Sequence, residues 1–261
     1  MAHPVVTEAE LVESAPAGAY RRLVLRAPEV ARRVGPGHFV MLRGRAFWIH
    51  RADVGGGTVE LVVAERGPGT RELVRSRVGD RLSLIAPLGT PFPVPEGPVS
   101  ALLVADGYGS AALFGLAEGI RRRGGQVGFI LGAASEERLF GTEAARELTQ
   151  DVLVVTEDGS AGLAGVVTEV VAQAVKAIDA TVVYACGPTP MLAEVAAVAG
   201  ELGARCWTAV EEAMACGTGL CAACLLPVIG ADGVSRSVRS CTDGPVFDGA
   251  RVRWAETGKA A

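Results

Sequence analysis

Short runs of apolar residues, several of them alternating with polar ones, recur through the first third of the chain. Glycine and proline separate these runs, and none of them has the length and 3.6-residue period of a long amphipathic helix. Short strands spaced by turn residues are typical of a small antiparallel barrel, which we predict for residues 1–97. The expected strands cover residues 5–11, 20–25, 38–42, 47–50, 59–64 and 81–85.

The pattern changes near residue 98, where apolar runs begin to alternate with helical segments. Continuous runs of Val, Leu and Ile between helices are typical of strands that are buried on both faces. Residues 98–212 are therefore predicted to form a parallel, doubly wound α/β domain. The expected strands cover 99–104, 127–131, 152–156, 181–185 and 206–210, and the expected helices cover 110–123, 142–149, 164–176 and 189–202.

Loops that are rich in glycine follow three of these predicted strands. Open α/β sheets bind ligands at the carboxyl ends of their strands, so the three loops together favour a nucleotide crevice. Any one of these loops alone is more typical of an ordinary turn. Cys186, in the third loop, is equally suited to be a small buried thiol. The candidate residues are Gly107, Gly109, Asp158, Gly159, Cys186, Gly187 and Pro188.

The last predicted domain, residues 213–261, contains four of the six cysteines of the chain. Their spacing is C-x4-C-x2-C followed by one distant cysteine, and Gly and Ala dominate between the first three. Such a backbone can fold tightly around an inorganic group, and the spacing matches the plant-type [2Fe–2S] pattern. A four-thiolate zinc site is the alternative, and disulfides are the least favoured. The predicted ligands are Cys216, Cys221, Cys224 and Cys241.

Two segments of the predicted barrel have residue types that suit a flavin nucleotide. The first places Arg45, Ala46, Phe47 and Trp48 on consecutive positions of a strand. Arginine can bind a pyrophosphate with two hydrogen bonds, and an aromatic ring can lie on a flavin. The second is a glycine-rich turn with Gly69 and Thr70 before an expected helix over 71–77, which is a geometry for binding anions. Each segment alone is also compatible with an ordinary strand or turn.

Composition narrows the functional classes further. The chain has 261 residues, of which 49% are hydrophobic and 21% charged, with a formal net charge of −4. This balance gives no reason to expect nucleic acid or an anionic membrane as a partner. We expect no targeting segment and no membrane span, and a thiolate-held cluster favours the reducing cytoplasm.

Barrel, dinucleotide module and cysteine loop follow one another in an order that resembles the electron-transfer subunit of bacterial two-subunit dihydroorotate dehydrogenase, within the ferredoxin–NADP reductase superfamily. The resemblance covers nearly the whole chain. Its most telling part is the segment Glu211-Glu212-Ala213-Met214-Ala215-Cys216-Gly217, and further marks are the segment from Tyr184 to Leu192 and the segment from Cys241 to Phe247.

The resemblance implies two bound cofactors and one partner. FAD would lie against Arg45, Ala46, Phe47, Trp48, Val62, Val63, Ala64, Gly69 and Thr70, and the four cysteines would hold a [2Fe–2S] cluster. A partner subunit would oxidise dihydroorotate on FMN, in an assembly of two copies of each subunit. The cluster would relay electrons singly, and FAD would pass them to NAD in pyrimidine biosynthesis. The chain itself would be an electron conduit without a catalytic residue.

Two positions depart from the family pattern. Trp48 stands where the family usually has Ser or Thr, and Asp106 stands in a first nucleotide loop where the family usually has a glycine run. The second departure leaves open whether NAD, NADP or neither binds. Two alternatives to the leading hypothesis remain, a related NAD(P)H–ferredoxin or hydrogenase-type reductase subunit and a zinc-stabilised binding module without redox activity.

Overall fold

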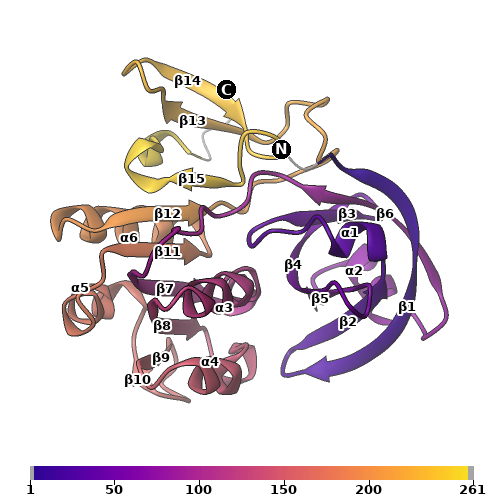
Figure 1. The fold of residues 1–261 in the computed structure, drawn as a ribbon, viewed down its shortest axis with the longest axis horizontal. Coiled ribbons are helices and arrows are strands. Elements are labelled where there is room, and N and C mark those ends of the chain that lie inside the picture. The colour runs from indigo at the N-terminus through magenta and orange to yellow at the C-terminus, as the bar shows by residue number, and fades with distance from the viewer. Residues whose placement is uncertain (1–2, 258–261) are drawn as a thin grey trace.

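The computed structural model describes residues 3–257, and its first third forms a closed antiparallel barrel (Figure 1). The strands follow one another around the barrel in the order β1-β2-β5-β4-β3-β6, which confirms the predicted architecture. Leucines from several strands, such as Leu11, Leu23 and Leu61, fill the interior and are completely buried. The elements are β1 (Val5–Ala17), β2 (Tyr20–Arg26), α1 (Pro28–Ala31), β3 (Phe39–Leu42), β4 (Arg45–Asp53), β5 (Thr58–Ala64), α2 (Pro68–Val74) and β6 (Arg81–Leu88).

The middle of the chain forms the predicted α/β domain. Its strands β7, β8, β9, β10, β11 and β12 pair in parallel. The elements are β7 (Ser100–Asp106), the 3-10 helix η1 (Gly107–Ala112), α3 (Phe114–Arg122), β8 (Gln126–Ala133), the 3-10 helix η2 (Glu136–Arg138), α4 (Thr142–Leu148), β9 (Val152–Thr156), β10 (Leu163–Ala164), α5 (Thr168–Ala177), β11 (Val182–Cys186), α6 (Thr189–Glu201) and β12 (Arg205–Ala209).

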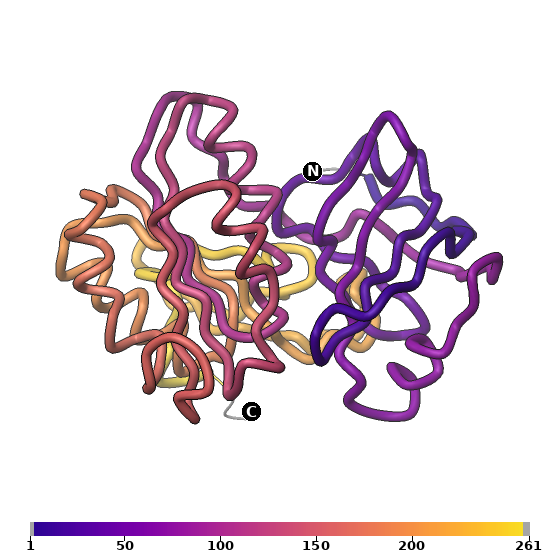
Figure 2. The backbone as a smooth tube through the Cα atoms, turned by 90° about the horizontal axis from the view of Figure 1, so that it is seen from below, coloured from indigo at the N-terminus to yellow at the C-terminus, as the bar shows by residue number. Residues whose placement is uncertain are grey.

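Alternate residues of the central strand β7 serve two different cores, because neighbouring side chains of a strand point to opposite faces. Leu103 packs in a cluster with Phe114 of α3 and with Trp48 of the barrel. Leu102 packs on the other face in a cluster with residues of α5 and α6. The first core therefore continues from the α/β domain into the barrel, and Figure 2 shows the two bodies side by side.

The C-terminal part contributes a strand to the sheet of the α/β domain. Its elements are β13 (Leu225–Ile229), β14 (Ser235–Arg239), β15 (Val246–Asp248) and the 3-10 helices η3 (Gly249–Arg251) and η4 (Trp254–Glu256). Strands β13 and β14 form a hairpin, whereas β15 pairs antiparallel with β12 at the edge of the sheet. The sheet is thus mixed, and it extends beyond the boundary that we predicted at residue 212.

Three predicted helices differ from the observed ones. The helix expected over 110–123 starts as the 3-10 helix η1, and regular helix begins only at Phe114, because Gly107 has φ +54° and Ser110 bonds backbone carbonyls. The helix expected over 71–77 runs over Pro68–Val74, since proline suits the first turn. The helix expected from 164 begins at Thr168, because Ala164 belongs to β10. No helix among residues 3–257 is long and apolar enough to cross a membrane.

Candidate functional site

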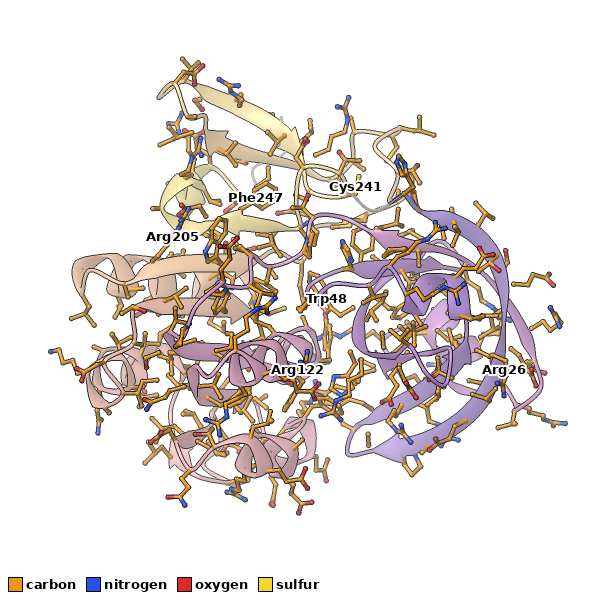
Figure 3. The ribbon with its side chains drawn as sticks, in the orientation of Figure 1. Arg26, Trp48, Arg122, Arg205, Cys241 and Phe247 are labelled. Carbon is orange, nitrogen blue, oxygen red and sulfur yellow. The ribbon has the colours of Figure 1, made fainter. Side chains whose placement is uncertain are left out.

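A cavity of about 550 Å³ opens between the barrel, the α/β domain and the start of the C-terminal part. Most of the predicted flavin residues line it, which are Arg45, Ala46, Phe47, Trp48, Val62, Ala64 and Thr70. Val63 does not, because it alternates with its neighbours on β5 and is buried in the barrel core. Trp48 lies where the barrel meets the α/β domain (Figure 3).

The first turn of α2, which contains Gly69 and Thr70, lies against the guanidinium group of Arg45. A Cβ atom at Gly69 would lie 2.5 Å from Nε of Arg45, so the glycine lets the guanidinium group lie directly against the backbone. The Thr70 hydroxyl accepts hydrogen bonds from the amides of Arg66 (2.9 Å) and Gly67 (3.0 Å), and this fixes the turn. A cationic side chain held beside a bare backbone turn, with aromatic rings further along the same cavity, fits a flavin with a pyrophosphate.

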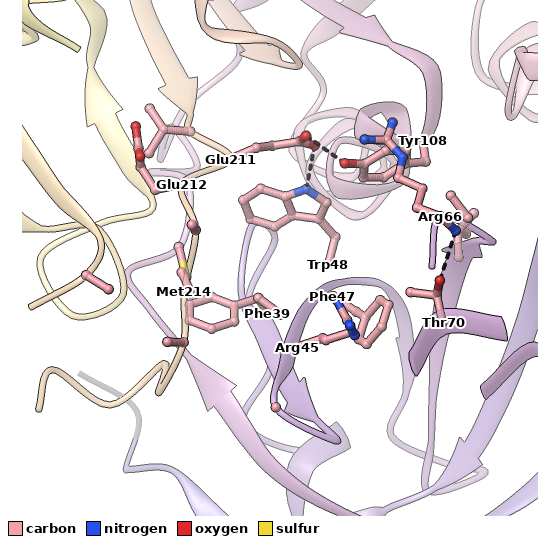
Figure 4. A pocket seen from close by; sticks show the side chains of 18 residues that line it. Phe39, Arg45, Phe47, Trp48, Arg66, Thr70, Tyr108, Glu211, Glu212 and Met214 are labelled. Atoms are coloured by element: carbon pink, nitrogen blue, oxygen red, sulfur yellow. Dashed lines mark hydrogen bonds between the residues drawn. The ribbon is translucent and has the colours of Figure 1, made fainter. Parts of the chain in front are cut away.

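Several residues of this cavity were not predicted from their position in the sequence. Tyr108 donates a hydrogen bond to Oε2 of Glu211 (2.7 Å), and the indole Nε1 of Trp48 donates to Oε1 of the same carboxylate (3.3 Å; Figure 4). Burial and the charge of Glu211 raise the pKa of Tyr108. Arg66, Glu212 and Met214 also belong to this group, and burial raises the pKa of Glu212. In the sequence, the only indication of these residues was the segment from Glu211 to Gly217, on which the family resemblance rests most strongly.

The four predicted cluster ligands lie in two contacting pairs. Cys216 contacts Cys221, and Cys224 contacts Cys241. The Thr218 amide donates to the sulfur of Cys216 (3.4 Å) and, with Cys221, lowers the pKa of Cys216 to about 6. No three His, Cys, Asp or Glu side chains among residues 3–257 converge as a site for one metal ion.

The loop around these cysteines fits a two-iron cluster in which each iron takes one pair of thiolates. Gly217 has φ +69°, and a Cβ atom there would overlap the side chain of Met41. The Ser240 hydroxyl, directly before Cys241, is buried and has no hydrogen-bond partner within the described part of the chain. Such a group is suited to donate to the sulfur atoms of a cluster. The other two cysteines, Cys186 and Cys206, are buried in strands β11 and β12.

A second cavity of about 220 Å³ lies at the carboxyl ends of the parallel strands, where the nucleotide crevice was predicted. Asp106, Glu157 and Glu194 contribute carboxylates to its wall, and no Lys or Arg belongs to the lining. Burial, followed by the charges of Glu157 and Glu211, raises the pKa of Asp106. Asp106 precedes η1 but its side chain does not cap that helix. The crevice therefore presents carboxylates at the sheet edge where open α/β sheets bind their ligands.

The predicted crevice residues are only partly brought together. Pro188 lines the crevice, and a Cβ atom at Gly187 would lie 3.3 Å from Cβ of Asp106. Asp158 is exposed and accepts a hydrogen bond from the Ser160 amide (3.0 Å). Gly107, Gly109, Gly159 and Cys186 line neither cavity.

These features define a flavin-dependent reductase of the ferredoxin–NADP reductase type with an added iron–sulfur domain. The sequence model of the iron-sulfur cluster binding domain of dihydroorotate dehydrogenase B matches residues 211–253. A dihydroorotate dehydrogenase B (NAD(+)) electron transfer subunit homolog of Thermotoga maritima is 34% identical over 89% of this chain and 82% of its own length. The electron transfer subunit of Geobacillus thermodenitrificans is 35% identical over 88% and 91%. The chain belongs to the family of dihydroorotate dehydrogenase B electron transfer subunits.

Solved structures share the fold of this chain. A chain of the NADH-dependent reduced ferredoxin-NADP oxidoreductase, described for flavin-based electron bifurcation, superposes with a TM-score of 0.84 at 29% identity, over 95% of this chain and 90% of that one. A ferredoxin NADP+ reductase from Neisseria gonorrhoeae, with bound FAD and NADP, superposes with a TM-score of 0.62 at 20% identity, over 76% and 92%. The second likeness shows the shared fold.

We predict that serine at any of Cys216, Cys221, Cys224 or Cys241 removes or strongly weakens the visible iron–sulfur absorbance of the purified protein. The reason is that each substitution takes a thiolate from one iron. Cys206→Ser is the matched control, because this cysteine is buried in β12 away from the loop, and its spectrum should stay unchanged. Zinc without iron in anaerobically isolated protein would contradict the ligand assignment.

We predict that Asp106→Asn tightens the binding of NAD+ about tenfold. Two unit charges ~4 Å apart interact by about 4 kcal/mol at an effective dielectric near 20, and a third of that is roughly a decade in affinity. Because the pKa of Asp106 is raised, protonation at falling pH should tighten binding to the wild type but not to the variant. Calorimetric titration from neutral pH down into the acid range tests both statements. Equal affinities with parallel pH profiles would refute the repulsion.

Proposed function

We propose that this chain carries electrons from a dihydroorotate-oxidising partner, through a [2Fe–2S] cluster and FAD, to NAD. One observation carries the proposal: the same backbone segment lines the flavin cavity and supplies the cluster ligands. Met214 and Ala215 are part of the cavity wall, and Cys216 follows directly. Ala223 also lines the cavity, and it is followed by Cys224. A flavin in the cavity and a cluster on these cysteines would therefore lie on either side of the same short stretch of backbone.

The residues of the chain would bind and orient the cofactors and would take no part in covalent chemistry. Arg45 would bind the flavin pyrophosphate through its guanidinium group, and Trp48 would lie against the ring system. A bound flavin supplies the chemistry that joins single-electron steps to the transfer of a hydride. Glu211 holds Trp48 and Tyr108 at fixed positions in the cavity through its two carboxylate oxygens.

The relatives' designation as electron transfer subunits implies a catalytic partner. We propose that this partner contains FMN, that two copies of each subunit assemble, and that the complex works in pyrimidine biosynthesis in the cytoplasm. The reducing cytoplasm suits a cluster held by thiolates. The net charge of −4 offers no support for a nucleic-acid partner.

A reductase subunit that exchanges electrons with ferredoxin is the second candidate. The likeness to the NADH-dependent reduced ferredoxin-NADP oxidoreductase, at a TM-score of 0.84, favours it. The test is to mix the anaerobic holoprotein either with reduced ferredoxin or with a dihydroorotate-oxidising FMN subunit and dihydroorotate. We expect dihydroorotate to bleach the flavin and cluster bands only when that subunit is present. Bleaching by ferredoxin alone would favour the second candidate, and a colourless protein would favour the zinc-stabilised module.

Leu220 in the cluster loop is a prominent exposed apolar side chain. Its exposed fraction is 87%, and its neighbour Cys221 is exposed as well. An apolar group at the accessible edge of the cluster is suited to contact a redox partner.

We predict that Leu220→Asp weakens the binding of the FMN subunit at least about tenfold without changing the visible spectrum, because a charge at the centre of an interface must lose its water. Sedimentation velocity or surface plasmon resonance measures the affinity. Val54→Asp is the matched control, since Val54 is 59% exposed in the barrel hairpin between β4 and β5. Equal weakening by both variants would argue against a docking role for the loop.

A further inference from the structure

Neighbouring residues at the start of η1 contribute to the walls of the flavin cavity and of the acidic crevice. Asp106, directly before η1, lines the crevice, whereas Tyr108, its second residue, lines the flavin cavity. The side chain of Tyr108 therefore stands at the partition between the place expected for a dinucleotide and the place expected for the flavin. Hydride transfer requires the reacting atoms to approach to about 3–3.5 Å, a separation that leaves no room for an aromatic ring between them.

Contacts from three other parts of the chain hold the Tyr108 ring in this place, and Figure 4 shows Glu211 and Arg66 beside it. Its hydroxyl donates to Glu211, which also accepts a hydrogen bond from Trp48 of the barrel. The guanidinium group of Arg66 lies 4.9 Å from the ring centroid, and Tyr20 packs edge-on at 6.2 Å. The phenol thus joins the α/β domain both to the barrel and to the segment that leads to the cluster.

The backbone that follows Tyr108 is fixed, so a movement that opens the partition would be made by the side chain. A Cβ atom at Gly109 would lie 2.7 Å from the carbonyl oxygen of Cys186, which shows how closely the turn packs on β11. The Ser110 hydroxyl lies 2.9 Å from the carbonyl oxygen of Gly107 and 3.0 Å from that of Phe140. Gly107, directly before Tyr108, has φ +54°, a conformation that glycine adopts without strain.

We propose that Tyr108 and Glu211 control the access of the dinucleotide to the flavin. In the closed arrangement the phenol is hydrogen-bonded to Glu211 and covers the flavin cavity on the side of the crevice. The nicotinamide ring reaches the flavin once this bond breaks and the phenol turns away. The inference rests on the proposed function for the identity of the dinucleotide, and on the contacts of Tyr108 for the closure.

The hydrogen bond to a carboxylate makes the closed arrangement the more populated one. Hydrogen bonds to charged groups are stronger than those between neutral groups, so the phenol leaves Glu211 only in a minor fraction of molecules. The apparent dissociation constant of a ligand that needs the open arrangement is therefore the intrinsic constant divided by the fraction of open molecules. Tyr108 and Glu211 are therefore positioning residues, and their loss should change the affinity for the dinucleotide more than the rate at saturation.

The main test is Tyr108→Phe in the flavin- and cluster-loaded protein, with NAD+ as the probe. This variant keeps the ring and removes the bond to Glu211, so the calorimetric dissociation constant should fall about tenfold. KM for NADH in flavin reduction should fall by a similar factor while kcat changes little. Tyr184→Phe is the matched control, because its hydroxyl donates to the Pro93 carbonyl (2.9 Å) and its side chain lines neither cavity. It should leave both constants unchanged.

Access to the flavin can also be measured without any dinucleotide. Iodide should quench the fluorescence of bound flavin more strongly in Tyr108→Ala than in the wild type, and Glu211→Gln should give an intermediate value because it keeps an acceptor. If Tyr108→Phe binds NAD+ as the wild type does, or if iodide quenching is the same in Tyr108→Ala and the wild type, the proposed closure is wrong. Failure of the proposed function has a different signature, namely no bleaching of the wild-type flavin by dihydroorotate and the FMN subunit.

Discussion

The short connection between β12 and the first cluster cysteine fixes the geometry of the whole site. Only residues 210–215 lie between the end of β12 at Ala209 and Cys216. The amide of Val210 donates to the carbonyl oxygen of Pro245 (3.0 Å), so the connection is tied to the segment that follows the last cluster cysteine. Because both sides of the cluster loop are anchored at one edge of the sheet, the cluster site and the flavin cavity keep a constant separation.

The barrel and the α/β domain do not behave as two independent bodies joined by a linker. Phe39 and Trp48 of the barrel belong to the same buried cluster as Phe114 and Tyr184 of the α/β domain. The Tyr184 hydroxyl also donates to the carbonyl oxygen of Pro93 (2.9 Å), in the chain between the two domains. A buried apolar core shared by the barrel and the α/β domain resists a hinge movement between them. This rigidity suits a protein whose task is to hold redox groups at fixed distances.

Local patterns in the sequence predicted the elements that depend on local chemistry. The alternation of residues gave the barrel and the parallel strands, and the cysteine spacing indicated the cluster loop. The sequence did not indicate that β15 pairs with β12, because a strand of three residues is too short to show an alternation of apolar and polar positions. It also did not single out Tyr108, whose importance comes from Arg66 and Glu211, which are distant in the chain. Val63 was grouped with its neighbours although the strand turns it to the other face.

The pairing of β15 with β12 also constrains how the protein can be made. β12 would present an unpaired edge until β15, which follows it by more than thirty residues in the chain, has left the ribosome. An unpaired strand edge is a template for association with other chains. Newly made chains that lack their C-terminal part are therefore exposed to aggregation. Insertion of the cluster, whose four predicted ligands all lie between these two strands, would favour completion of the sheet during biogenesis.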